Sequence, residues 1–168
     1  AMDIDAAGLP FLQGLTPPAG SKSVEELKTI VSWAERPFII KGVMTARGAE
    51  KALEAGASGI VVSNHGGRVL DHCPATAEVL PEIADAVGGK MTIFVDGAIR
   101  SGMDIFKALA LGADAVLIGR PFVTSVYGGG EEGVKLYVSK LKAELADTMR
   151  MCGAHSLAEI DRSMIYRG

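Results

Sequence analysis

The chain has 168 residues, of which 48% are hydrophobic, 22% charged and 5% aromatic, and its formal net charge is −3. This length suits one domain with a sizeable core, and the composition, with 21 glycines, is typical of an α/β protein. The negative charge argues against a nucleic-acid surface, so any bound anion must be met by local arginines. No apolar run predicts a membrane span. Cys73 and Cys152 lie far apart without metal-type spacing, which favours reduced thiols in a cytoplasmic protein.

Helical segments alternate along the chain with short apolar segments. Ser and Thr residues precede three of the helical segments as N-caps, and Gly56 and Gly112 follow two of them at positions typical of helix ends. The first residues resemble the end of a buried strand, so we expect the chain to be a piece of a longer protein. In chain order we expect a strand end at 1–6, helices at 21–34, 45–55, 75–87, 101–112 and 131–151, and strands at 38–42, 59–63, 91–96 and 115–119.

The apolar segments are continuous rather than alternating, which predicts parallel strands that are buried on both faces. Both a doubly wound sheet and a (β/α)8 barrel satisfy this pattern. A barrel assembles its active site from many strand ends, whereas an open sheet collects ligand groups at one switch point. Polar residues follow every predicted strand, which favours the barrel: Asp3, Lys41, Ser63 with His65, Asp96 and Arg120.

A complete barrel takes about 250 residues. We therefore expect an α/β fold in which this chain supplies roughly the second half of a TIM (β/α)8 barrel, from the end of strand 4 through helix 8. The remaining strands would come from an absent N-terminal half or, less simply, from another chain.

The stretch Ser63-Asn64-His65-Gly66-Gly67-Arg68 places a base and a cation three residues apart at the end of a strand. This pair suits proton abstraction beside an anionic group; the alternative is a surface loop in which both side chains are merely solvated. Lys41 directly follows an apolar strand. A buried lysine needs either an acidic partner or a ligand that gains negative charge, and we favour the ligand.

Two further loops have the features of phosphate sites. The segment 96–102 runs from a strand into a helix, with Gly97 permitting close backbone approach and Arg100 beside the helix start. Gly119-Arg120-Pro121 ends the next strand with a second arginine. Barrels often bind phosphate at the loops after their last two strands, and the arginine fork matches phosphate oxygens. Each arginine alone would more simply form a surface salt bridge.

Four motifs together resemble the FMN-dependent 2-hydroxy-acid oxidase and dehydrogenase family, which includes glycolate oxidase, lactate oxidase and flavin-linked lactate dehydrogenase. They are residues 40–42, 61–68, 95–102 and 117–121. The resemblance implies that residues 1–168 form the C-terminal half of one FMN-binding TIM-barrel domain, with residues 1–20 as a strand end and lid-like loop. It also implies FMN as cofactor, a small L-2-hydroxy acid oxidised to the 2-oxo acid, no metal and a homo-oligomer.

The resemblance further implies roles for single residues. His65 would take a proton from the substrate hydroxyl or α-carbon, Asp3 would pair with His65 and stabilise its charge, and Arg68 would hold the substrate carboxylate. The remaining residues would bind FMN: Lys41 at the flavin N1/O2 edge, Ser63 at the ring, and Asp96, Gly97, Arg100, Gly119 and Arg120 at the ribityl chain and phosphate. The alternatives are a catalytically inactive half-barrel or scaffold, and a related flavin-barrel isomerase.

Overall fold

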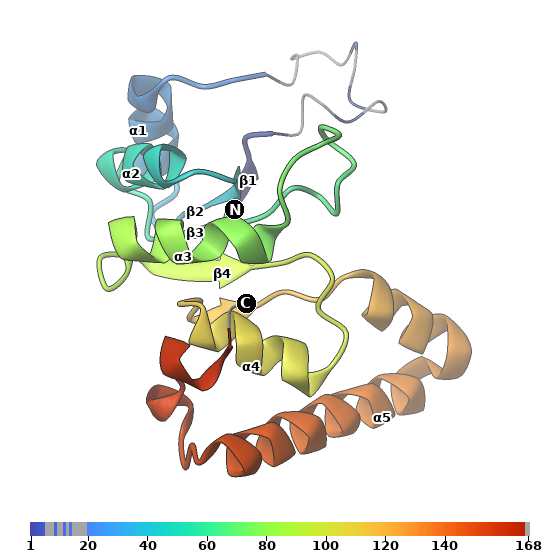
Figure 1. Cartoon of the computed structure of the whole chain (residues 1–168). Coiled ribbons are helices and arrows are strands. Elements are labelled where there is room, and N and C mark those ends of the chain that lie inside the picture. Colours follow the sequence, from blue (N-terminus) through green and yellow to red (C-terminus); the bar gives the residue numbers. More distant parts are fainter. Residues whose placement is uncertain (6–8, 10–11, 13, 15–19, 167–168) are drawn as a thin grey trace.

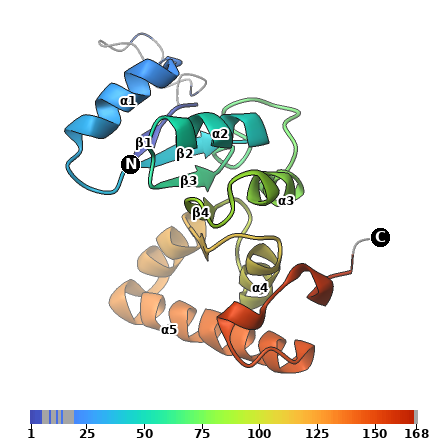
Figure 2. The same cartoon turned by 90° about the vertical axis from the view of Figure 1, so that its left-hand side faces the viewer.

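The structure is a computed structural model that describes residues 1–5, 9, 12, 14 and 20–166 (Figures 1 and 2). Most of the segment expected as a lid-like loop lies outside the described residues. The strands are β1 (Met2–Asp3), β2 (Ile39–Val43), β3 (Gly59–Val62), β4 (Thr92–Val95) and β5 (Ala115–Val116). The helices are α1 (Val24–Trp33), α2 (Ala46–Glu54), α3 (Thr76–Val87), α4 (Gly102–Ala110) and α5 (Arg120–Cys152), with short 3-10 turns at Leu157–Glu159 and Arg162–Met164.

The five strands form one parallel sheet in the order β1-β2-β3-β4-β5. Because parallel crossovers are right-handed, a strand order without reversal places every helix on the same face of the sheet. The helices accordingly follow the outer side of the sheet, with α1 and α2 near β1 and β2, and α4 and α5 near β5 (Figures 1 and 2). A doubly wound sheet would require a switch point, which this order lacks. The sheet is therefore part of a (β/α)8 barrel, which confirms the predicted fold class.

The main core lies between the sheet and the helices that cover it. Every residue of β3 is buried, and Ile40, Ile60 and Ile93 from three neighbouring strands are fully enclosed. Leu80 and Ile83 of α3 meet them from the helical layer. This packing holds the strands in register and thereby fixes where the loops at their carboxyl ends begin.

Local signals in the sequence set the helix boundaries. The hydroxyls of Ser23, Thr45 and Ser101 accept hydrogen bonds from backbone N–H groups in the first turns of α1, α2 and α4, as the sequence predicts. Gly56 (φ +83°) and Gly112 (φ +107°) follow α2 and α4 in left-handed conformations that favour glycine. Each helix therefore ends just before the loop that leads into the next strand.

The longest helix differs from the prediction. The sequence predicts a helix over 131–151 after a glycine turn, but α5 already begins at Arg120. Only Gly130 (φ 55°, ψ −136°) departs from helical geometry, and it separates two helical segments. Pro121 suits the first turn of a helix, where its missing N–H costs nothing. The prediction was therefore incomplete, and Arg120 lies at the start of a helix rather than in an extended loop.

The segment after α5 folds back onto the helical layer. Ala154 and Ile160 pack against Phe106 of α4. Arg162 pairs with Asp85 of α3 at 2.7 Å and donates a hydrogen bond to a backbone carbonyl of the same helix. In the described part of the chain, none of the helices combines the length and hydropathy that crossing a bilayer requires.

Candidate active site

A cavity of about 300 Å³ lies at the carboxyl ends of the strands, between Lys41 of β2 and the segments that follow β3, β4 and β5. It contains most of the residues predicted from sequence: Lys41, His65, Arg68, Asp96, Gly97, Arg100, Gly119 and Arg120. Asp3 touches two of these residues, and Ser63 is fully buried behind the loop. A larger cavity of about 820 Å³ lies away from the strand ends, on the helical layer between α3, α4 and the end of α5. Its lining is mainly apolar, so we place the chemistry in the smaller cavity.

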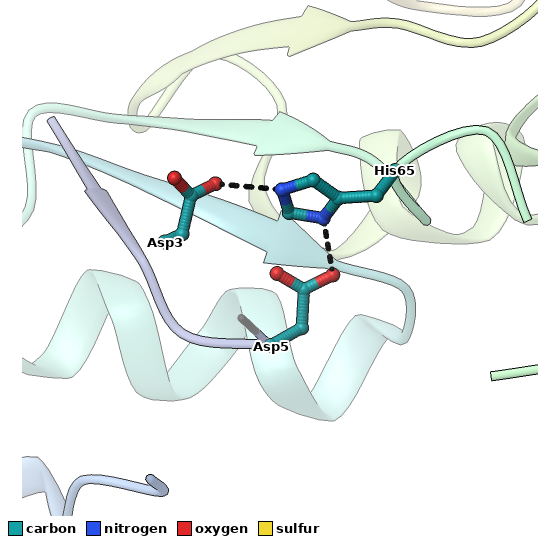
Figure 3. Close-up of side chains that lie close together, drawn as sticks. All are labelled: Asp3, Asp5 and His65. Atoms are coloured by element: carbon teal, nitrogen blue, oxygen red, sulfur yellow. Dashed lines mark hydrogen bonds and ion pairs between the residues drawn. The ribbon is translucent and has the colours of Figure 1, made fainter. Parts of the chain in front are cut away.

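His65 lies between two carboxylates (Figure 3). Its Nδ1 is 2.9 Å from Oδ2 of Asp5, and its Nε2 is 3.2 Å from Oδ1 of Asp3. The Lys41 ammonium lies 2.8 Å from Nε2 and donates to Oδ1 of Asp3 at 2.7 Å. A lysine ammonium can only donate, so Nε2 must accept from it. The arrangement thus assigns a neutral His65 whose proton is on Nδ1 and is donated to Asp5.

Sequence reasoning missed Asp5 and named Asp3 as the one carboxylate beside the histidine. The expected contact between Asp3 and His65 is present, but the Nδ1 position is held by Asp5. A β-bulge at Gly42 (φ +94°) makes this arrangement possible, because a Cβ at Gly42 would overlap the Asp5 carboxylate. The alternation Asp3-Ile4-Asp5 was the available signal, since strand residues two apart project to the same side.

The loop that carries His65 is held in a strained conformation. His65 has φ +53°, a left-handed value that costs a non-glycine residue about 1–3 kcal/mol and is typical of functional sites. Its backbone N–H donates to the hydroxyl of Ser63 at 3.2 Å, and its carbonyl accepts from Nε of Arg68 at 3.0 Å. Asn64 also fixes the loop by accepting from the N–H of Gly67 at 3.1 Å. These bonds direct the imidazole toward the cavity and leave the outer nitrogens of the arginine available.

The backbone N–H and the backbone carbonyl of Arg100 are both hydrogen-bonded to side chains. Its N–H donates to Oδ2 of Asp104 at 3.0 Å, and its carbonyl accepts from the Tyr137 hydroxyl at 3.0 Å. Burial opposes ionisation of Asp104, but hydrogen bonds from Ser101 and from the Arg100 backbone outweigh it and lower the pKa of that carboxyl. Burial raises the pKa of Tyr137, so its hydroxyl remains a donor at neutral pH. The side chains of Asp104 and Tyr137 thus fix the backbone of Arg100 beside the cavity and do not occupy its guanidinium group.

Arg120 reaches from the start of α5 to the loop after β3. A Cβ at Gly66 would lie 2.7 Å from a terminal nitrogen of this guanidinium, so the two loops touch there. Across residues 1–5 and 20–166, no acidic side chain forms an ion pair with Arg100 or Arg120. Two unpaired guanidinium groups on one cavity favour a doubly charged anion such as a phosphate monoester.

Asp96 contributes a buried acceptor that no described residue satisfies. Its Oδ1 is buried without a hydrogen-bond partner, whereas its backbone carbonyl accepts from Thr76 at 2.6 Å. Gly97 (φ +97°) follows it, in a conformation that favours glycine and brings the backbone to the cavity wall. An unmet carboxylate oxygen fits a ligand that carries hydroxyl donors beside its phosphate. The ribityl phosphate of FMN has this donor and charge pattern.

The same neighbourhood also contains a group of possible metal ligands. One atom from each of Asp3, Asp5 and His65 lies within 4.8 Å of the others. However, the two carboxylates contact different nitrogens of the imidazole, and the Lys41 ammonium already provides the positive charge beside Nε2 and Asp3. The arrangement is therefore better described as a histidine that is hydrogen-bonded within a group of two carboxylates and a lysine than as a metal centre.

Among the described residues, the carboxyl ends of this parallel sheet carry two arginines without an acidic partner and a buried carboxylate oxygen without a hydrogen-bond donor. These features are typical of barrels that bind a phosphate-bearing ligand. The model of the family described as FMN-dependent dehydrogenase matches residues 12–167. Glycolate oxidase of Spinacia oleracea is 49% identical over 144 residues, which are 86% of this chain and 38% of that protein. The peroxisomal (S)-2-hydroxyacid oxidase GLO3 of Arabidopsis thaliana is 46% identical, with 86% and 39% covered.

A solved structure of mandelate oxidase with benzoyl-formic acid superposes with a TM-score of 0.81 at 40% identity. The match covers 87% of this chain and 44% of that one. The chain therefore belongs to the FMN-dependent dehydrogenase family, as the sequence motifs predict. It spans about 40% of the length of the curated relatives that it matches.

Proposed function

We propose that residues 1–168 form the C-terminal half of one FMN-binding barrel domain, and that the protein oxidises a small L-2-hydroxy acid to the 2-oxo acid. The observation that carries this proposal is the shared cavity of His65, Arg68 and Lys41 with the arginines of the two phosphate-type loops. Relatives named glycolate oxidase, 2-hydroxyacid oxidase and mandelate oxidase support this substrate class.

The unpaired guanidinium groups of Arg100 and Arg120 would hold the FMN phosphate, and the backbone at Gly97 and Gly119 would approach it closely. Oδ1 of Asp96 would accept from a ribityl hydroxyl and so gain the partner that it lacks. Lys41 would face the N1/O2 edge of the ring and favour negative charge there, and Ser63 would lie on the ring side. FMN, when bound, supplies the acceptor for two electrons from the substrate.

Arg68 would bind the substrate carboxylate through the guanidinium nitrogens that its bond to the His65 carbonyl leaves free. Nε2 of His65 would take the substrate proton once Lys41 turns toward the flavin, because in the resting arrangement that nitrogen accepts from the lysine. The positive charge formed on the imidazole lies between Asp3 and Asp5, which stabilise it. These residues thus bind, orient and deprotonate one small hydroxy acid.

The test combines cofactor binding with anaerobic reduction. Purified protein should bind FMN with a flavin spectrum, and L-lactate, glycolate or mandelate should bleach that spectrum. His65→Ala should retain FMN and lose reduction by at least about 100-fold, the range for loss of a general base. Arg120→Ala should instead weaken FMN binding about tenfold or more, as loss of a charge-assisted contact does.

The same measurements separate the alternative functions. An inactive scaffold would bind no FMN, and a flavin-barrel isomerase would bind FMN that hydroxy acids leave oxidised. Bleaching at a normal rate in His65→Ala would contradict the role given to the histidine. Comparing initial rates with the three acids would then decide whether lactate is the preferred substrate.

Two sequence predictions are also part of the proposal. A cytoplasmic location rests on the two unpaired cysteines, Cys73 and Cys152, while several plant relatives are named peroxisomal. A homo-oligomer rests on the family resemblance alone. Cell fractionation with an antibody to this chain and native mass measurement test the two statements separately.

A further inference from the structure

We propose that Tyr137 sets the spacing between Arg100 and Arg120, and so determines how strongly the protein holds the phosphate group of its cofactor. The inference rests on the proposed function, because it needs these two arginines to bind the FMN phosphate. It goes further by giving a positioning role to a helix residue that does not line the active-site cavity.

The hydroxyl of Tyr137 acts on the first arginine. It donates to the backbone carbonyl of Arg100 at 3.0 Å, while the N–H of Arg100 donates to Oδ2 of Asp104 at 3.0 Å. Asp104 belongs to the helix that this loop begins, so its bond is local. The bond from Tyr137 comes from a different helix, 37 residues along the chain. It therefore fixes the loop, and the direction in which the arginine side chain leaves it, relative to α5.

The ring of Tyr137 acts on the segment that carries the second arginine. The two segments of α5 meet at an angle where Gly130 departs from helical geometry (Figure 1). Phe122 lies two residues after Arg120 in the first segment, and its ring packs edge-on against that of Tyr137 with centroids 5.1 Å apart. The hydroxyl and the ring of Tyr137 thus restrain the two arginines relative to each other.

A second contact holds the same part of α5 against the Arg100 loop. Oε2 of Glu144 accepts from the backbone N–H of Gly102 at 2.8 Å. Glu144 follows Tyr137 by about two helical turns, so both side chains project from the same face of α5. A Cβ at Gly102 would overlap the backbone of Glu144 and Leu145, so the start of α4 lies directly against this face. Tyr137 therefore projects from a helix that is itself fixed beside the loop.

The cavities around these residues agree with this arrangement. A cavity of about 430 Å³ has Tyr137 and both arginines in its wall, and Arg100 and Arg120 also line the active-site cavity. The two arginines thus lie at the boundary of both cavities, with Tyr137 beside them.

The position of the hydroxyl separates its effect on ligand affinity from its effect on stability. Its bond to the Arg100 carbonyl lies at the exposed surface, so water can replace it and the fold should lose little. The fixed direction of the arginine is lost, however. A phosphate that contacts both guanidinium groups must then order one of them on binding, which weakens the affinity. The effect should therefore be confined to ligands that carry phosphate.

The test measures the binding of FMN, riboflavin and inorganic phosphate to the cofactor-free protein. Riboflavin has the ring and the ribityl chain of FMN but no phosphate. Tyr137→Phe removes the hydroxyl and keeps the ring, so FMN and phosphate should bind about three- to tenfold more weakly, as loss of one hydrogen bond does. The affinity for riboflavin should stay unchanged. Tyr127→Phe, at a tyrosine of the same helix that is 89% exposed, is the matched control and should change none of the three affinities.

Double variants assign each part of the effect to one arginine. In Arg100→Ala, the further change Tyr137→Phe should cause no additional loss of FMN affinity, because the hydroxyl acts through Arg100. Tyr137→Leu also removes the ring contact with Phe122, so it should weaken FMN binding more than Tyr137→Phe does. That additional loss should disappear in Arg120→Ala.

The possible failures are distinct. Equal weakening of FMN and riboflavin binding in Tyr137→Phe would make Tyr137 a general structural residue and overturn the inference. Unchanged FMN affinity, or a loss that persists in Arg100→Ala, would overturn it too. If the wild-type protein binds phosphate with the expected dependence on Tyr137 but does not bind FMN, the proposed function is wrong and the positioning role stands. A wild-type protein that binds neither ligand would overturn both.

Discussion

Removing the Asp96 side chain should change stability and cofactor affinity in opposite directions. Its Oδ1 is buried and unpartnered, and a buried polar atom left without a hydrogen bond costs about 1–3 kcal/mol. The bonds that hold the local backbone, from Asp96 N to the Val62 carbonyl and from Thr76 to the Asp96 carbonyl, do not involve the carboxylate. We therefore expect Asp96→Ala to raise the unfolding free energy of the cofactor-free protein by about 1 kcal/mol or more.

The same substitution removes the oxygen that would accept from a ribityl hydroxyl. A hydrogen bond to a charged group contributes about 1.5–3 kcal/mol, and each 1.4 kcal/mol is tenfold in Kd. FMN should therefore bind Asp96→Ala about 10–100-fold more weakly. Urea unfolding without FMN and quenching of flavin fluorescence on titration give the two quantities independently.

Asp114→Ala is the matched control, because Asp114 is also an aspartate next to a strand, directly before β5, but its carboxylate accepts from the N–H of Ile93 at 2.8 Å. Removing this carboxylate leaves the N–H of Ile93 without its acceptor, so the free energy of unfolding should fall while the affinity for FMN stays unchanged. A cofactor-free Asp96→Ala protein that is less stable than wild type would refute the reasoning about the orphan oxygen. An unchanged FMN affinity would remove Asp96 from the cofactor site.

Two further predictions concern the residues that position the site. Gly42→Ala should displace the Asp5 carboxylate and add left-handed backbone strain of about 1–2 kcal/mol. His65 should then lose its preference for the Nδ1–H tautomer in ring ¹⁵N spectra. An unaltered tautomer would show that the bulge can accept a Cβ without moving Asp5. Asp104 has a lowered pKa in the fold, so its contribution to stability is complete above its ordinary value of 3.8 and is lost as the pH falls through the lower folded value. Asp104→Asn should flatten the acid limb of a stability-against-pH curve, and an equally steep limb would assign the acid sensitivity to other carboxyls.

The strand order and the starts of α1, α2 and α4 could be predicted from sequence because they depend on local, strong signals. Continuous apolar strands between capped amphipathic helices leave few topologies, and Ser23, Thr45 and Ser101 each sit one residue before their helix. The loops with arginines could be located for the same reason, since each directly follows a strand. Their convergence on one cavity is a consequence of the parallel arrangement.

The remaining features depend on contacts between segments far apart in sequence. The role of Asp5 is decided by a bulge at Gly42, 37 residues later, which makes room for its carboxylate. The first segment of α5 contains β-branched residues and three consecutive glycines, a composition that disfavours a helix on propensity alone. The long helix forms there nonetheless, and across the kink at Gly130 the ring of Phe122 packs edge-on against that of Tyr137, with centroids 5.1 Å apart.

The contact between Arg120 and Gly66 ties together two loops that the chain separates by more than fifty residues. One loop presents the histidine and the other begins the last long helix. Any side chain placed at Gly66 must move the flexible end of Arg120 away from this loop and must also adopt φ +68°, a left-handed value that favours glycine. A glycine is therefore expected at this position in homologues that keep an arginine at the start of α5.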